Sequence, residues 1–158
     1  HYGRFGRDSE RLYPMFIGND FYVRGYNNDD LYQRATSEES KNHALTVNQL
    51  IGSRISMINA EMRIPLTGPE KLTLLKSRLF FSDLVFFGDA GLAWSKNRPV
   101  QFNWKLPNPN VNIPVYSAGA SLRINLFGYM VLEPYLAVPF QRFQAKPHFG
   151  IFFSGGWW

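Results

Sequence analysis

Strict alternation of polar and apolar residues is the feature that most constrains the fold of this chain. Between residues 117 and 125, every odd position is polar or glycine and every even position is apolar. A period of two is the period of a β-strand, in which successive side chains point to opposite faces of a sheet. The segment is therefore predicted to be a strand with one polar and one apolar face.

Four further segments show a comparable period and are also predicted to be strands. In each of them one parity is mainly apolar, whereas the other parity holds polar or charged residues, or a mixture. Pro134 is a flaw in the third segment, because proline cannot donate a hydrogen bond to a neighbouring strand. The four segments are Gly52–Leu66, Leu79–Ser95, Met130–Val138 and His148–Trp158.

The connections between these segments alternate between long and short. Residues 27–48 and 96–114 are polar or rich in proline and asparagine, which predicts long loops. Residues 126–129 suit a tight hairpin, and residues 72–78 suit a turn or a brief helix. Short turns at one end and long loops at the other are typical of outer-membrane barrels. Ahead of the first long loop, residues 13–26 are predicted to be extended.

Aromatic residues favour a membrane barrel over a soluble sheet. They make up 16% of the chain, and many lie near the ends of predicted strands, as the interfacial girdles of membrane barrels do. The charged residues within the strands also avoid the apolar parity. A soluble barrel or sandwich with its apolar face inward remains an alternative. The aromatic residues near strand ends are Trp94, Tyr116, Phe127, Tyr129, Phe140 and Trp157.

Composition argues against several other classes of protein. The absence of cysteine excludes a disulfide scaffold and thiolate metal sites. The longest apolar run, residues 124–132, is far shorter than the roughly 18–20 residues of a membrane-spanning helix. The net charge of +5 is scattered, which argues against a nucleic-acid partner. The three histidines lack ligand spacing, so we expect no metal, no cofactor and no enzymatic activity.

One short motif, Val23-Arg24-Gly25-Tyr26, stands apart from the strands. Read alone, it is a strand that runs into a turn, with Gly25 at a positive φ and Arg24 in solvent. In its context it resembles the (V/I)RG(F/Y) motif of the superfamily that holds BamA, TamA and the two-partner-secretion transporters. In that family the motif lies in a long loop that folds back into the lumen of a barrel.

Three later segments carry the same resemblance, in the family's order. Residues 59–66 are similar to the strand after the long loop, and residues 86–91 to the family's strand with an aromatic residue, Asp, a small residue and Gly. The turn at residues 125–129 and Glu133-Pro134 depart from the family pattern, which marks a divergent member. The C-terminal β-signal of outer-membrane proteins is matched by Phe149, Ile151, Phe153 and Trp157.

The resemblance implies an all-β fold, an antiparallel transmembrane β-barrel of about sixteen strands. Residues 1–158 would form its C-terminal part. Residues 13–50 would supply the last part of a strand and the inward-folding loop, and residues 51–158 about five final strands. The chain begins without an initiator methionine, which suggests a piece of a longer protein.

The resemblance also implies roles for particular residues. Glu61 and Asp89 lie on the lumen-facing parity of successive strands, and are implied to meet Arg24. A guanidinium suits this role, because its planar fork binds carboxylates bidentately and stays charged. The last strand is implied to flank a lateral seam, where an incoming strand can add to the exposed edge.

The function implied is that of an assembly or translocation machine in the outer membrane of a Gram-negative cell. Such a barrel inserts outer-membrane proteins or exports polypeptides. Its partners would be the lipid bilayer, unfolded outer-membrane proteins or secreted polypeptides, and accessory lipoproteins. Two alternatives stay open: a barrel that anchors an N-terminal soluble domain, and a soluble β-domain that binds a partner.

Overall fold

The described part of the chain consists mostly of β-strands. The structure, a computed structural model, describes residues 2–3, 14–26, 47–68, 75–76, 80–96, 98–102, 110–127, 129–142 and 146–155. Within these ranges, no helix is long and apolar enough to cross a membrane. The strands are Tyr2–Gly3 (β1), Met15–Phe16 (β2), Ile51–Gly52 (β3), Arg54–Gly68 (β4), Leu75–Lys76 (β5), Phe80–Trp94 (β6), Val115–Leu126 (β7), Met130–Pro139 (β8) and His148–Gly155 (β9).

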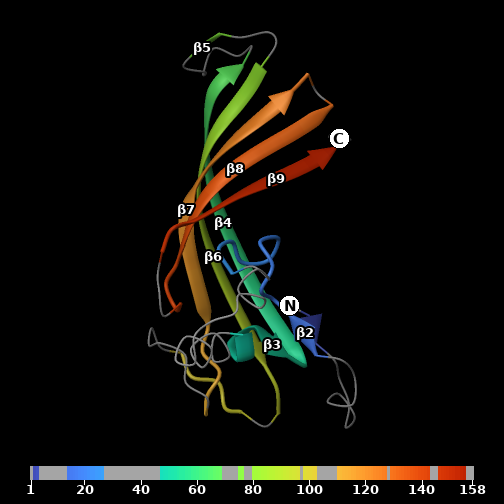
Figure 1. The fold of residues 1–158 in the computed structure, drawn as a ribbon, viewed down its shortest axis with the longest axis vertical. Coiled ribbons are helices and arrows are strands. Elements are labelled where there is room, and N and C mark those ends of the chain that lie inside the picture. The colour runs from blue at the N-terminus through green and yellow to red at the C-terminus, as the bar shows by residue number, and fades with distance from the viewer. Residues whose placement is uncertain are drawn as a thin grey trace, which may run out of the picture.

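Five long strands form one sheet in the order of the sequence. β4, β6, β7, β8 and β9 lie side by side, each antiparallel to the next, and β1 pairs with β4. Figure 1 shows a tall, strongly twisted sheet. β5 pairs in parallel with the end of β4, and β2 and β3 form a separate two-stranded sheet near the other end. The prediction of five antiparallel strands is confirmed.

The register gathers the charged residues of neighbouring strands on one face. Asn59 of β4 lies opposite Asp89 of β6, and Asp89 lies opposite Ser117 of β7. Farther along, Arg123 of β7 lies opposite Asp83 of β6. Directly opposed residues share a face of the sheet. We call this face, on which the loop of residues 17–26 lies, the inner face.

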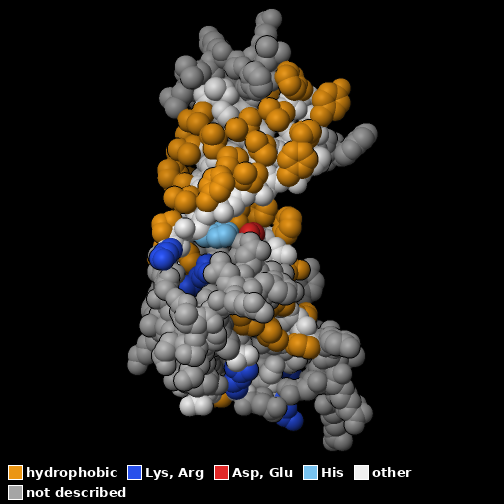
Figure 2. Space-filling model, in the orientation of Figure 1, with side chains coloured by type: hydrophobic (Ala, Val, Ile, Leu, Met, Phe, Trp, Pro, Cys, Tyr) orange, Lys and Arg blue, Asp and Glu red, His pale blue; other side chains and the backbone are white. Residues whose placement is uncertain are grey.

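The opposite, outer face carries large apolar side chains that are exposed. They follow the apolar parity that the sequence showed, on even positions of β4, β6 and β8 and on odd positions of β9. Figure 2 shows apolar side chains gathered over the upper part of the molecule, with the visible Lys and Arg side chains below them. These exposed outer-face residues include Ile58, Met62, Ile64, Phe86, Leu136, Phe149, Ile151 and Phe153.

Residues 17–26 pack onto the inner face through a small apolar core. Ile17 and Val23 are fully buried there, and Tyr26 is nearly so. Around them pack side chains from the helical turn at 47–50 and from three strands of the sheet. Burial of these side chains removes apolar surface from water, which holds the loop to the sheet. The strand and turn residues of this core are Leu50, Ile55, Ala93 and Val115.

Several local predictions were wrong. Residues 13–26 are not extended throughout, since only β2 is a strand and residues 19–25 form turns that bury the motif. β4 runs on to Gly68 through an irregularity at residues 65–67, and residues 75–76 add a short strand where a turn or helix was expected. Residues 47–48 begin a helical turn. Residues 27–46 lie outside the described ranges.

Pro134 acts as expected for a proline within a strand. It stays within β8, but the pairing of β7 with β8 is interrupted between Ser121↔Tyr135 and Ile124↔Leu132. The pairing of β8 with β9 continues through this point. The interruption therefore weakens the ladder on the β7 side of β8 alone.

Candidate functional site

The loop of residues 17–26 forms a compact turn that presents Arg24 to the sheet. The backbone N–H groups of Tyr22 and Val23 both donate to the carbonyl of Asn19, at 2.8 and 3.0 Å. These bonds satisfy backbone groups that burial would otherwise leave unpaired. The turn therefore holds the backbone before Arg24 in one conformation.

Gly25 makes the sharp bend that follows the arginine. Its φ is 88°, the positive value that the sequence predicted and that glycine adopts without steric cost. Its N–H donates to Asp20 Oδ1 at 3.1 Å. A side chain here would also be crowded, because a Cβ would lie 3.3 Å from the Cβ of Ala137 on β8. Both the bend and the close approach to β8 require a glycine.

Arg24 binds Asp89 of β6 through a planar, two-pronged contact. Its Nε and Nη2 donate to the two carboxylate oxygens at 2.8 and 3.0 Å, and its backbone N–H donates to Oδ2 at 3.1 Å. The Arg24 side chain is 7% exposed and that of Asp89 is 0% exposed. Such charge-assisted bidentate bonds are among the strongest in proteins. Asp89 is therefore the principal partner of Arg24.

Two more carboxylates and an aromatic ring complete the surroundings of Arg24. Its Nη2 donates to Glu61 Oε1 of β4 at 2.9 Å, and its Nη1 lies 3.8 Å from Glu133 Oε1 of β8. The guanidinium carbon lies 3.6 Å from the ring centre of Phe87, a cation–π contact. One loop residue thus contacts side chains of β4, β6 and β8.

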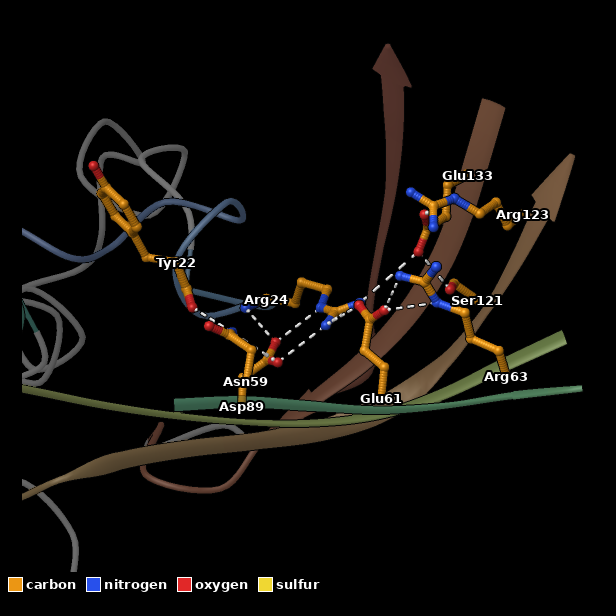
Figure 3. A network of polar contacts seen from close by, with 9 residues as sticks. All are labelled: Tyr22, Arg24, Asn59, Glu61, Arg63, Asp89, Ser121, Arg123 and Glu133. Atoms are coloured by element: carbon orange, nitrogen blue, oxygen red, sulfur yellow. Dashed lines mark hydrogen bonds and ion pairs between the residues drawn. The ribbon is translucent and has the colours of Figure 1, made fainter. Parts of the chain in front are cut away.

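The outer carboxylates are shared with arginines of the strands, as Figure 3 shows. Arg63 donates to Glu61 Oε2 at 2.8 and 3.2 Å. Arg123 Nε lies 3.5 Å from Glu133 Oε2, and the other oxygen of Glu133 accepts a hydrogen bond from a serine hydroxyl. Each of these carboxylates therefore has a cation other than Arg24. The nine residues of the network are Tyr22, Arg24, Asn59, Glu61, Arg63, Asp89, Ser121, Arg123 and Glu133.

The charge of Arg24 is maintained despite its burial. Burial by itself lowers the pKa of the guanidinium, but the hydrogen bonds and negative charges of Asp89 and Glu61 outweigh it and raise the pKa above its ordinary value. Arg24 is therefore charged at every physiological pH.

Tyr26 fastens the end of the motif to the start of β7 and to the residues that follow β8. Its hydroxyl lies 3.1 Å from the carbonyl of Tyr116 and 3.2 Å from Gln141 Oε1, and it accepts a hydrogen bond from the N–H of Gln141 at 3.1 Å. Burial raises the pKa of Tyr26 well above its ordinary value, so the phenol stays neutral.

Close packing explains one of the glycines in β6. A Cβ placed on Gly91 would lie 2.6 Å from Val23 Cγ2 and 2.9 Å from Ile17 Cδ1. Both side chains are fully buried and cannot move into solvent. The loop can therefore sit at this depth because position 91 has no side chain.

A cavity of about 300 Å³ lies between the loop and the inner face. It separates the Arg24 ion pairs from the inner side of β9, which contributes Phe152 and Ser154 to its wall. Among the described residues, no group of three His, Asp or Glu side chains could hold a metal ion. The cavity is lined by Asp20, Phe21, Arg24, Asn59, Glu61, Arg123, Val131, Glu133, Phe152 and Ser154.

The predicted site residues fall into two groups on opposite faces. Val23, Arg24, Gly25, Tyr26, Glu61 and Asp89 meet on the inner face. Phe149, Ile151 and Phe153 lie on the outer face of β9, with 63%, 56% and 62% of their surface exposed. Trp157 lies outside the described residues.

Sequence reasoning predicted no role for Glu133, Arg63, Arg123 or Phe87 in the surroundings of Arg24. All four occupy the polar or mixed parity of predicted strands, the same parity as Glu61 and Asp89. Their odd or even positions in the strands would have been enough to predict that they lie on the inner face. Only the cross-strand register and the position of the loop bring them within reach of one guanidinium.

The described residues thus form a sheet with an exposed apolar outer face and a loop that is ion-paired to its inner face. The sequence matches the Omp85 superfamily domain over residues 12–156, and the chain belongs to that superfamily. Its members are transporters and assembly factors of outer membranes rather than enzymes. No individual curated protein or solved structure gives a significant match.

Proposed function

We propose that this chain is the C-terminal part of an outer-membrane barrel that inserts outer-membrane proteins or exports polypeptides. The observation that carries the proposal is the bidentate contact between Arg24 and the fully buried Asp89. The strands of a barrel wall can pair without a loop on their inner face, so a loop held there by a buried ion pair indicates a further role. Such a loop suits a transporter or assembly factor whose lumen keeps one conformation until a client polypeptide binds.

The two faces of the sheet support a barrel in a bilayer. The outer face exposes large apolar side chains, and the inner face holds the charged network. A closed barrel of about sixteen strands would place the first face against lipid and the second in the lumen. The location would be the outer membrane of a Gram-negative cell, with unfolded client polypeptides and accessory lipoproteins as partners.

The outer-face residues of β9 support a role for the last strand as an assembly signal beside a lateral seam. Phe149, Ile151 and Phe153 would contact lipid, and Trp157 would continue their spacing. A strand edge at a seam can accept an incoming strand by backbone hydrogen bonds. Within this proposal, the lumen network fixes the loop and the seam lies at β9.

A charge-swap cycle in the full-length protein tests the proposal. Arg24→Glu, Asp89→Arg and the double variant would be compared by heat-modifiable gel mobility and by the amounts of other outer-membrane proteins. We expect each single swap to impair both measurements. The double variant should recover them only in part, because the new carboxylate at position 24 still faces Glu61 and Glu133. Asp83→Asn, on the same face of β6, is the control: it removes a carboxylate without placing a second cation opposite Arg123, and should behave like the wild type.

The outcomes separate the candidate functions. If barrel folding suffers while other outer-membrane proteins keep their amounts, the assembly role fails, and either export of a polypeptide or a barrel that anchors a soluble domain replaces it. If the full-length protein purifies in the soluble fraction without detergent, the membrane location itself is wrong, and a soluble β-domain replaces the barrel.

A further inference from the structure

The loop makes a second set of contacts, with the last strand. The ring of Phe21 lies against that of Phe152 on β9, with centroids 5.2 Å apart and planes tilted by 37°. Asp20 Oδ2 lies 4.0 Å from His148 Nε2, at the start of the same strand. His148 and Phe152 both have the inner-face parity of β9. Two adjacent loop residues therefore touch the strand at two points along its inner side.

The turn that presents Arg24 also fixes these two residues. The N–H of Phe21 donates to Asn19 Oδ1 at 3.0 Å, and Asp20 Oδ1 accepts from the N–H of Gly25 at 3.1 Å. Asp20 thus uses one carboxylate oxygen within the turn and turns the other toward His148. A shift of the loop would therefore move the contacts to β6 and to β9 together.

An aromatic row continues from the loop across the sheet. The ring of Tyr135 on β8 stacks on Phe152 with centroids 4.9 Å apart, and Phe87 on β6 meets Tyr135 edge-on at 6.3 Å. Phe21 caps this row at the β9 end. Arg24 lies over Phe87 at the β6 end. The same loop therefore contacts both ends of a row that joins β6, β8 and β9.

The last strand is the one that such contacts can influence most. In the described part of the chain β9 pairs with β8 alone, from Met130↔Gly155 to Ala137↔His148. In the proposed barrel β9 borders the lateral seam, whose pairing has to open to admit an incoming strand, whereas β6 and β7 are each paired to described strands on both edges. Contacts on its inner face therefore add a larger share of its attachment than they would for β6 or β7.

We propose that Asp20 and Phe21 are positioning residues that hold β9 against β8, so that the position of the loop controls how readily the last strand opens. The inference rests on the proposed function, because it gives the seam at β9 a regulator. Phe21 is 76% exposed and touches Phe152 with one side of its ring. Such a contact can be released without unfolding the loop.

Hydrogen–deuterium exchange of the full-length protein in lipid nanodiscs tests the proposal. We expect Phe21→Ala to speed amide exchange in residues 148–155 by roughly three- to tenfold, the range expected from loss of one aromatic pair. Exchange in β6 and β7 should stay unchanged. Phe21→Tyr keeps the ring and should exchange like the wild type. The matched control is Tyr22→Ala, since that variant removes a neighbouring ring but keeps the backbone carbonyl that accepts from Asn59.

Two further comparisons make the test decisive. Phe152→Ala should speed exchange in β9 more than Phe21→Ala, because it also removes the stack on Tyr135. Adding Phe21→Ala to Phe152→Ala should change little, because the Phe21–Phe152 pair is already absent. Unchanged exchange in β9 of Phe21→Ala would overturn the proposal, and so would an equal rise across β6, β7 and β9. The result is independent of the charge-swap cycle. If Phe21→Ala speeds exchange in β9 but the charge swaps leave the amounts of client proteins unchanged, the role of Asp20 and Phe21 in holding β9 stands and the assembly function is rejected.

Discussion

The loop is attached to β6 and to β9 in two different ways. On β6, the fully buried Asp89 accepts three hydrogen bonds of 2.8 to 3.1 Å from Arg24. On β9, the loop offers one ring face to Phe152 and a carboxylate oxygen 4.0 Å from His148. The first attachment buries two charged side chains, whereas in the second Phe21 is 76% exposed to solvent. The difference indicates that the loop is held mainly by β6 and more weakly by β9.

The energetic scales of the two attachments differ accordingly. Removal of one partner from a buried ion pair costs about 3–5 kcal/mol, since the other charge is left without a counter-ion. An aromatic pair contributes about 0.5–1.5 kcal/mol beyond its buried area. A disturbance large enough to release the β9 contact therefore leaves the β6 attachment in place.

The largest effect is expected from Asp89→Asn. The amide keeps the shape of the carboxylate but removes its charge, and its NH₂ group would face the donors of Arg24. We expect the folded barrel to lose about 3–5 kcal/mol, measured as a lower urea midpoint of the heat-modifiable band.

The matched control for this substitution is Asp83→Asn. Asp83 lies on the same face of β6, six residues earlier and outside the Arg24 network. It should shift the midpoint by little. Equal shifts for the two variants would show that Asp83 and Asp89 contribute equally to the free energy of unfolding. The conclusion that the Arg24–Asp89 pair is the main attachment of the loop would then be wrong.

A steric change should disturb the β6 attachment without altering charge. Gly91→Val introduces a side chain at a position where a Cβ alone would lie 2.6 Å from Val23 and 2.9 Å from Ile17. Overpacking of this kind costs about 1–3 kcal/mol. We expect faster proteolysis within residues 17–26 of the full-length protein. Gly88→Val is the control in the same strand, because a Cβ there has no atom within 4 Å. Similar proteolysis of both variants would mean that the loop does not pack closely on β6.

The strands could be predicted from the sequence because their signal is local. Ser117 to Asn125 alternates at every position, and this pattern alone identifies the strand and its two faces. The ends of β4 and the short β5 escaped prediction, since they depend on pairing across the sheet near residues 65–76. The helical turn at 47–50 was missed because it is held by tertiary contacts, of Leu50 with the loop core and of Gln49 with the backbone of residues 111 and 113, rather than by a helical pattern.

Only those parts of the site that follow from a sequence motif, or from the odd or even position of a residue in a strand, could be predicted. The motif resemblance implied that Arg24 would meet Glu61 and Asp89, and these contacts are present. Nothing in the sequence distinguished Asp89 as the fully buried partner, because that depends on the depth of the loop over Gly91. The approach of Phe21 to Phe152 was equally hidden, since 131 positions separate the two rings.

A smaller effect is expected on the β9 side from Gly150→Ala. A Cβ at position 150 would meet the ring of Tyr135, which packs over the glycine in the aromatic row. Tyr135 is buried, so its ring has to shift within the aromatic row, and we expect a loss at the lower end of the about 1–3 kcal/mol that overpacking costs, because alanine adds a single methyl group. The measurement is amide exchange in β9. Gly155→Ala in the same strand has no atom within 4 Å of the new methyl group and should leave exchange unchanged.

The smallest effect is expected from Glu61→Gln, which sharpens the comparison within the ion-pair network itself. Glu61 is 28% exposed, and its second oxygen is bound by Arg63. After the substitution Arg24 keeps its three hydrogen bonds to Asp89, whereas Arg63, which is half-exposed, can turn to water. Ion pairs of this partly solvated kind contribute about 0–1 kcal/mol. The urea midpoint should therefore shift much less than for Asp89→Asn, and Arg63→Gln should cause a similarly small change. A midpoint shift as large as that of Asp89→Asn would show that Arg24 depends on both carboxylates equally, and the attachment would then be divided between β4 and β6.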